Sequence, residues 1–171
     1  MNKKKIGVMI FIIVVLIGIG GKLSMDKRAK DLAELHEIQT DLANYLYNNY
    51  RLYTFNKEEL DQLDKAYDAG KMTYPEYSKC LDEIAKYSDI SKIEFTGFSV
   101  SPMNILKVQY TINDVLDKET SLDTISAETK NLIFRVGEHD GKGEYSLEKK
   151  KEATNVSLPE NLVIYYEGGI K

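Results

Sequence analysis

The side chains that most often carry chemistry are few in this 171-residue chain. His36 and His139 are its only histidines, and neither has the second histidine or neighbouring cysteine that a zinc site requires. Cys80 is the only cysteine, so no intrachain disulfide can form. It falls on the apolar side of an expected helix, which is typical of a buried, inert thiol. We therefore predict no metal-binding and no cofactor-binding residues.

Carboxylates are the remaining candidates for catalysis. The pairs Glu58-Glu59 and Asp82-Glu83 are adjacent on expected helices, where neighbouring side chains point about 100° apart and do not converge on one substrate. The chain has no phosphate loop, nucleophile elbow or dinucleotide fingerprint. We expect a protein without catalytic residues. The alternative is a hydrolase that assembles two carboxylates from distant positions.

The net charge limits the partners. Four of the 23 basic residues flank an apolar N-terminal run, so the rest of the chain carries 27 acids against 19 bases, a net charge of −8. Nucleic-acid binding needs clustered Lys and Arg on one face, and an acidic body is repelled by anionic lipid. We expect no nucleic acid as partner and favour another protein, with a basic toxin as one candidate.

The apolar run predicts a membrane anchor. Residues 6–21 carry no charge, and eleven of them are Ile, Val, Leu or Phe. Extended to Leu23, the run spans roughly 27 Å as a helix, close to the thickness of a bilayer core. We predict that residues 1–23 are an uncleaved anchor in the cytoplasmic membrane. A cleaved signal peptide is the alternative, although an Ala-x-Ala type of cleavage site is absent and the only small residues are Gly18, Gly20, Gly21 and Ser24.

Basic residues flank both ends of this run, so the positive-inside rule is nearly balanced. A short basic N-terminus before a single span usually stays inside. We therefore expect residues 24–171 to form a single domain outside the cytoplasm, at the cell membrane. The flanking basic residues are Lys3, Lys4 and Lys5 before the run, and Lys22, Lys27, Arg28 and Lys30 after it.

Residues 24–88 have the spacing of helices. Leu32, Leu35, Leu42 and Leu46 form one stripe in a stretch without Gly or Pro, which predicts an amphipathic helix of about 28 residues that reaches Tyr53. Four tyrosines lie around the far end of this helix. We expect them to be core or half-buried, with a binding patch as the alternative. They are Tyr45, Tyr47, Tyr50 and Tyr53.

A helical hairpin follows. The first helix runs from Leu60 to Gly70, where the glycine ends it in the left-handed conformation. Thr73 and Glu76 predict a capping box at the start of the second helix, with Pro75 in its first turn.

Residues 60–86 resemble the short C-terminal domain, a helical hairpin of many bacterial envelope and secreted proteins. The chain departs from that family at Ala66, where a larger apolar residue is usual, and in placing the hairpin away from the C-terminus. The resemblance implies interaction or oligomerisation. The alternative is a generic hairpin that packs on the sheet. The matching residues are Leu60, Leu63, Asp68, Ala69, Gly70, Thr73, Glu76 and Tyr77.

Residues 91–171 have the alternation of strands. We predict an antiparallel hairpin of residues 93–100 and 106–112, with a bulge or bend at Gly97 and a turn at 101–104. A polar connection is expected at 113–130. Three further strands are expected around Leu132, Phe134 and Val136, then Tyr145 and Leu147, then Leu162, Ile164 and Tyr166, with a turn at 140–143.

The fold class that follows is α+β. The long helix and the helical hairpin would pack on a largely antiparallel sheet, and the N-terminal helix would cross the membrane. The segment Phe95–Met103, followed by a strand ending at Ile112-Asn113, is similar to small membrane-anchored proteins of unknown function from low-GC Gram-positive bacteria. These proteins pair a lysine-led hydrophobic start with a small α+β body. Membrane-anchored immunity proteins against secreted antibacterial toxins share that general layout.

We therefore expect a membrane-anchored, non-enzymatic protein-binding domain, for which immunity against a secreted toxin is the most concrete version. The alternative is a cell-envelope or secretion-system accessory that oligomerises through its helical hairpin.

Overall fold

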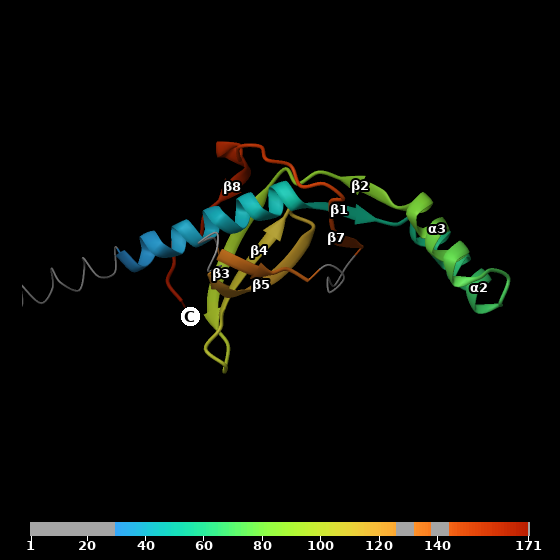
Figure 1. Cartoon of the computed structure of the whole chain (residues 1–171), viewed down its shortest axis with the longest axis horizontal. Helices are drawn as coiled ribbons and strands as arrows, with labels where there is room; N and C mark the ends of the chain where they lie inside the picture. Colours follow the sequence, from blue (N-terminus) through green and yellow to red (C-terminus); the bar gives the residue numbers. More distant parts are fainter. Residues whose placement is uncertain (1–29, 126–131, 138–143, 171) are drawn as a thin grey trace, which may run out of the picture.

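The computed structural model describes residues 30–125, 132–137 and 144–170, which form an α+β fold of three α-helices and two sheets (Figure 1). The anchor predicted for residues 1–23 lies outside the described residues. Among those described, no helix is long and apolar enough to cross a membrane.

The long helix (residues 30–49) lies across one face of the five-stranded sheet (Figure 1). Its predicted apolar stripe is confirmed, since Leu35, Leu42 and Leu46 are buried in the core. The prediction that the helix reaches Tyr53 is wrong, because Tyr50–Thr54 forms strand β1. The carbonyls of Asn48 and Asn49 accept backbone hydrogen bonds from residues 154 and 150, so tertiary pairing ends the helix here.

Strand β1 is the centre of a small antiparallel sheet with the order β2-β1-β7. Strand β2 spans Lys86–Ser88 and was not predicted, whereas β7 at Tyr145–Lys149 was. The expectation of one sheet is therefore corrected to two. Leu52 and Leu147 are register partners and both are fully buried, so this second sheet shares the core of the first.

The larger sheet has the order β6-β5-β4-β3-β8. Strands β3 (Ile93–Val100) and β4 (Leu106–Ile112) form the predicted antiparallel hairpin, with the predicted irregularity between Phe95 and Gly97. The turn between them contains Asn104 in the left-handed region, at a φ of 59°. Antiparallel pairing holds throughout this sheet apart from the β3–β8 pair, which is parallel.

The polar connection predicted at 113–130 is wrong over most of its length. Strand β5 spans Leu116–Ile125 and pairs with β4 on one side and β6 on the other. Its inward positions include Lys118 and Thr120, both buried, and the Thr120 hydroxyl lies 2.7 Å from the Tyr110 hydroxyl. Polar side chains at core positions hid the alternation that marks a strand. Residues 126–131 lie outside the described part.

The last strands agree in part with those predicted from the sequence. Strand β6 (Leu132–Arg135) carries the buried Phe134, as predicted. A single 3-10 turn, η1 (Glu160–Leu162), precedes the two-residue strand β8 (Val163–Ile164). The predicted strand around Leu162, Ile164 and Tyr166 is therefore confirmed only at Val163–Ile164, where Ile164 is exposed. The turn predicted at 140–143 lies outside the described residues.

The helical hairpin does form, but it does not pack on the sheet as predicted. Helices α2 (Lys57–Asp68) and α3 (Tyr74–Ile84) lie beyond β1 and β2 at one end of the molecule, away from the five-stranded sheet (Figure 1). The side chains of the long helix already cover the inner face of that sheet. The two short helices do not cover this inner face and contact each other instead.

Candidate functional site

The helical hairpin (residues 56–85) is built from local signals at each helix end. Asn56 is the N-cap of α2, and its side-chain oxygen accepts from the Glu58 amide at 2.9 Å. At the other end Gly70 takes a φ of 67°, as predicted. The Gly70 and Lys71 amides donate to the carbonyls of Tyr67 and Ala66, which is the Schellman pattern.

The capping box predicted for α3 is confirmed. The Glu76 carboxylate accepts from the Thr73 amide at 2.7 Å and from the Thr73 hydroxyl at 2.8 Å. The backbone hydrogen bond, and then the hydroxyl, lower the pKa of Glu76 below its ordinary value. Pro75 occupies the first turn, where a missing N–H costs nothing.

Two contacts hold the helices of the hairpin together. The Tyr77 hydroxyl donates to the Asp64 carboxylate at 2.7 Å, which raises the pKa of Tyr77 to about 12, because the bond favours the neutral phenol. The rings of Tyr67 and Tyr77 lie 4.6 Å apart between centroids. The hairpin is thus an ordered unit with contacts of its own.

The hairpin is attached through the β1–β2 ribbon, in which Thr54 and Lys86 are register partners. Arg51 braces this ribbon from both sides. Its guanidinium lies 3.6 Å from the ring centroid of Tyr87 and 2.7 Å from the Glu148 carboxylate on β7. The base of the hairpin is therefore fixed to the body, by which we mean the other described residues.

Within the described part of the chain, no residue of α2 or α3 is buried. Their apolar side chains are only half-covered, and Tyr74 is 67% exposed. The two short helices cover each other's apolar faces only in part, so a partly exposed apolar surface results. The half-buried apolar residues are Leu60, Leu63, Tyr77, Cys80, Leu81 and Ile84.

The hairpin is also acidic, with eight carboxylates against four lysines. An excess of negative charge on a surface attracts basic groups. The carboxylates are those of Glu58, Glu59, Asp61, Asp64, Asp68, Glu76, Asp82 and Glu83, and the lysines are Lys57, Lys65, Lys71 and Lys79.

The structure does not bring together the side chains that the sequence offered for chemistry. His36 is exposed on the long helix and stacks on Tyr165 with 4.0 Å between ring centroids. Cys80 is a free, half-buried thiol on α3, so the expected full burial is not reached. His139 lies outside the described residues. Among the residues that the structure describes, no group of three or more His, Cys, Asp or Glu side chains could hold a metal ion.

Two features of the hairpin surface, its exposed tyrosines and its uncovered apolar faces, were not found from the sequence. The four tyrosines near the end of the long helix are core or half-buried, as expected. Among the described residues, the exposed tyrosines are Tyr67 and Tyr74 on the hairpin and Tyr87 at its base. The amphipathic pattern of α2 and α3 gave no indication that their apolar faces lack a cover. Their acidic charge, which is visible in the sequence, is the signal that marks the surface.

Comparison of the chain with protein-family models, with curated proteins and with solved structures yields no match in any of the three.

Proposed function

We propose that this protein is a non-enzymatic binding protein that captures a basic protein partner with its helical hairpin. The single observation that carries the proposal is the projecting, acidic hairpin with its half-covered apolar side chains. If the hairpin served only to stabilise the fold, its helices would bury their apolar faces against the body, since apolar burial is the main driving force of folding.

The proposal includes an N-terminal anchor in the cytoplasmic membrane, formed by residues 1–23, and a body outside the cytoplasm. Its support is the uncharged run at residues 6–21 with basic residues at both ends. Immunity is the most concrete version of this function, because a tethered acidic hairpin would meet a basic toxin beside the membrane on which the toxin acts.

The second candidate is an envelope or secretion-system accessory that oligomerises through the hairpin. The half-covered apolar side chains of α2 and α3 favour it, because a second copy would cover them. The charge argues against it. Two hairpins that meet would each bring eight carboxylates against four lysines, and like charges across an interface are costly.

Photo-crosslinking in native membranes separates these candidates. A photoreactive residue at Tyr74 is expected to yield an adduct with a basic protein, while the same residue at the exposed Val156, on the body, yields none. Adducts only between copies of this chain would support the accessory. Equal adducts from both positions would remove the hairpin as the binding surface.

A charge-reversal variant sharpens the test. Asp68→Lys with Asp82→Lys places lysines near the C-terminal ends of α2 and α3, where the helix dipole tolerates them. The adduct at Tyr74 should then fall at least tenfold. The matched control, Glu152→Lys with Glu167→Lys, makes the same charge change at exposed positions of the body and should leave the adduct unchanged.

The immunity version has its own test. Expression of the intact chain in a toxin-sensitive strain should reduce killing, and the double variant of the hairpin should restore it. Killing that the intact chain leaves unchanged would remove this version and leave the wider proposal in place.

A further inference from the structure

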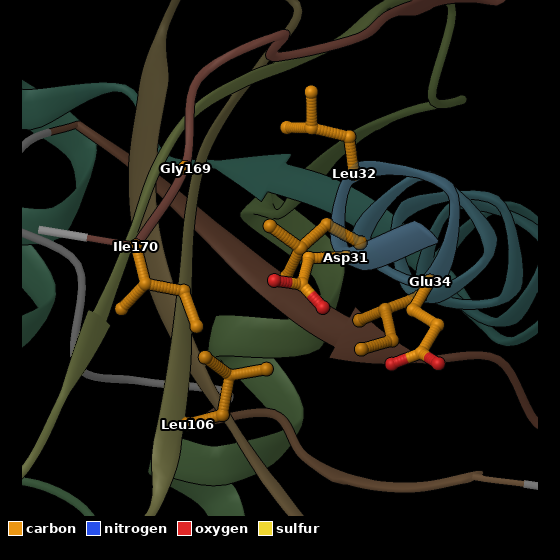
Figure 2. A pocket seen from close by; sticks show the side chains of 8 residues that line it. Asp31, Leu32, Glu34, Leu106, Gly169 and Ile170 are labelled. Carbon is orange, nitrogen blue, oxygen red and sulfur yellow. The ribbon is translucent and has the colours of Figure 1, made fainter. Parts of the chain in front are cut away.

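A second surface lies on the opposite end of the body from the hairpin. It is a groove of about 560 Å³ between residues 31–38 of the long helix and the C-terminal segment (Figure 2). Apolar side chains dominate its lining. Leu32, Leu35 and Ile38 come from the helix, and Leu106 and Ile170 come from the facing wall.

The two walls of the groove are fixed to one another by polar contacts just beyond it. Gln39 is buried, and its side-chain oxygen accepts from the Tyr166 amide at 2.7 Å while its amide nitrogen donates to the Tyr166 carbonyl at 3.2 Å. The Tyr165 ring stacks on His36. Ile170 forms a parallel bridge with Phe98 of β3, which holds the far end of the segment. These contacts link the two walls on either side of the groove.

Acidic side chains stand at the edge of this groove. Asp31 and Glu34 line it from the helix, opposite Leu106 and Ile170, and both are exposed (Figure 2). Lys30 lies 3.8 Å from Glu34, but both side chains are mostly exposed, so this pair neutralises the edge only weakly. The residues that line the groove include no lysine, arginine or histidine. An occupant therefore meets an apolar floor with negative charge beside it.

We propose that this groove binds a cationic amphipathic helix of a partner protein. Its apolar face would lie on the half-buried Leu32, Ile38 and Leu106. Its lysines or arginines would lie beside Asp31 and Glu34. This inference rests on the proposed function, since it adds a second surface and a chemical class for the captured protein. The helix side of the groove covers residues 31–38, roughly 10 Å of helix, which matches two turns of a helix packed alongside.

The charge of the groove favours a cationic helix over three other occupants, which are a second copy of the chain, a lipid and a neutral apolar molecule. A second copy of the chain would bring Asp31, Glu34 and Glu37 of its own helix against the same acidic edge. Anionic headgroups of lipids would be repelled by that edge. A neutral apolar molecule would fill the floor but would gain nothing from the charge of the carboxylates.

The test uses the full-length chain in nanodiscs of zwitterionic lipid, with a photoreactive residue in place of Ile170. The probe is a biotinylated 18-residue helix of leucine and lysine in amphipathic order. We expect adducts at position 170 to exceed those from the same photoreactive residue at Val156 at least tenfold. Val156 contacts Asn48, ten residues beyond Ile38 on the long helix, so it reports non-specific labelling.

Charge reversal at the groove provides the decisive variant. Asp31→Lys with Glu34→Lys should abolish the excess at position 170, while Glu144→Lys with Glu152→Lys should leave it within twofold. Both pairs are exposed in the folded chain, so loss of folding does not explain a difference.

Several outcomes would overturn the inference. Equal labelling at positions 170 and 156 would show that the groove does not select the helix. Equal labelling by a leucine–glutamate helix would show an apolar site without charge selection. Adducts with a second copy of the chain would assign the groove to self-association. Loss of the Tyr74 adducts with retained labelling at position 170 would remove the hairpin proposal alone, so the two failures are distinguishable.

Discussion

The body and the helical hairpin are stabilised in different ways. The body has a continuous core in which Phe98, Tyr110, Leu42 and other large side chains are fully buried. The hairpin is held by helix caps, one hydrogen bond between Tyr77 and Asp64, and one ring contact. Core burial specifies a fold that resists change, whereas capped helices with half-covered faces leave surface for a partner. Under the proposed function, the body provides the stable fold and the hairpin binds the partner.

The largest expected effect separates the two regions directly. Phe98→Ala removes a fully buried ring from the body and should lower the free energy of unfolding by about 3–5 kcal/mol. The matched change Leu63→Ala in α2, where the side chain is half-buried, should lower it by less than about 1 kcal/mol. Urea unfolding of the full chain measures both. Similar losses at the two positions would contradict the separation.

Gln39 offers the next test, because it joins the long helix to the C-terminal segment. Gln39→Leu leaves the Tyr166 amide and carbonyl without this partner and should cost about 1–3 kcal/mol. The same change at the exposed Gln62 of α2 is the control and should cost less than about 0.5 kcal/mol. Faster amide exchange over residues 165–170 should accompany the loss, and unchanged exchange there would contradict the bracing role of Gln39.

Gly70 tests whether the hairpin opens independently of the body. Gly70→Ala puts a Cβ on a residue with a φ of 67° and should destabilise the turn by roughly 1 kcal/mol, although no atom lies within 4 Å to clash with it. Gly169→Ala is the control, because that glycine is equally unobstructed and has no positive φ. Hydrogen exchange should accelerate in α2 and α3 only. Acceleration that spreads to β3 and β4 would mean that the two regions unfold together.

The smallest expected effect is a pH dependence confined to the hairpin. The pKa of Glu76 is lowered in the folded state, so its bonds to Thr73 stabilise the start of α3 above the ordinary glutamate pKa and are lost as the pH falls through the lowered value. Amide exchange of α3 should rise over this acidic window. Glu76→Gln should remove the pH dependence, and a dependence that persists in this variant would assign it to another group.

The hairpin could be predicted because its signals act between neighbouring residues. The features that the sequence did not reveal depend on contacts between distant segments. Gly70, Thr73 and Glu76 act on their immediate neighbours, so their roles were apparent from sequence. Strand β5 was missed because Lys118 and Thr120 occupy inward positions, where the aliphatic stem of the lysine and the bonded hydroxyl replace apolar side chains. No amphipathic pattern could indicate whether the apolar faces of α2 and α3 have a cover, since the pattern shows a face and not what lies against it.

The groove could not be predicted from the sequence either. Leu32, Leu35 and Ile38 lie on the predicted apolar stripe, which is ordinary for a core helix. Only the positions of Leu106 and Ile170, more than 60 residues further along the chain, leave part of that stripe uncovered. The acidic residues at the edge of the groove were visible as charge but not as neighbours of an apolar floor.

Replacement of the hairpin gives the most direct test of the division between a folding body and a binding hairpin. Thr54 and Lys86 are antiparallel partners, so an Asn-Gly turn in place of residues 55–85 can close the β1–β2 ribbon. The thermal unfolding midpoint of the shortened chain is measured first, to show whether its body still folds. The shortened chain is then purified from membranes, and co-purification of the protein that crosslinks at Tyr74 is measured. We expect the shortened chain to fold and to lose that protein. A shortened chain that unfolds, or one that is folded and still retains the partner, would contradict the account.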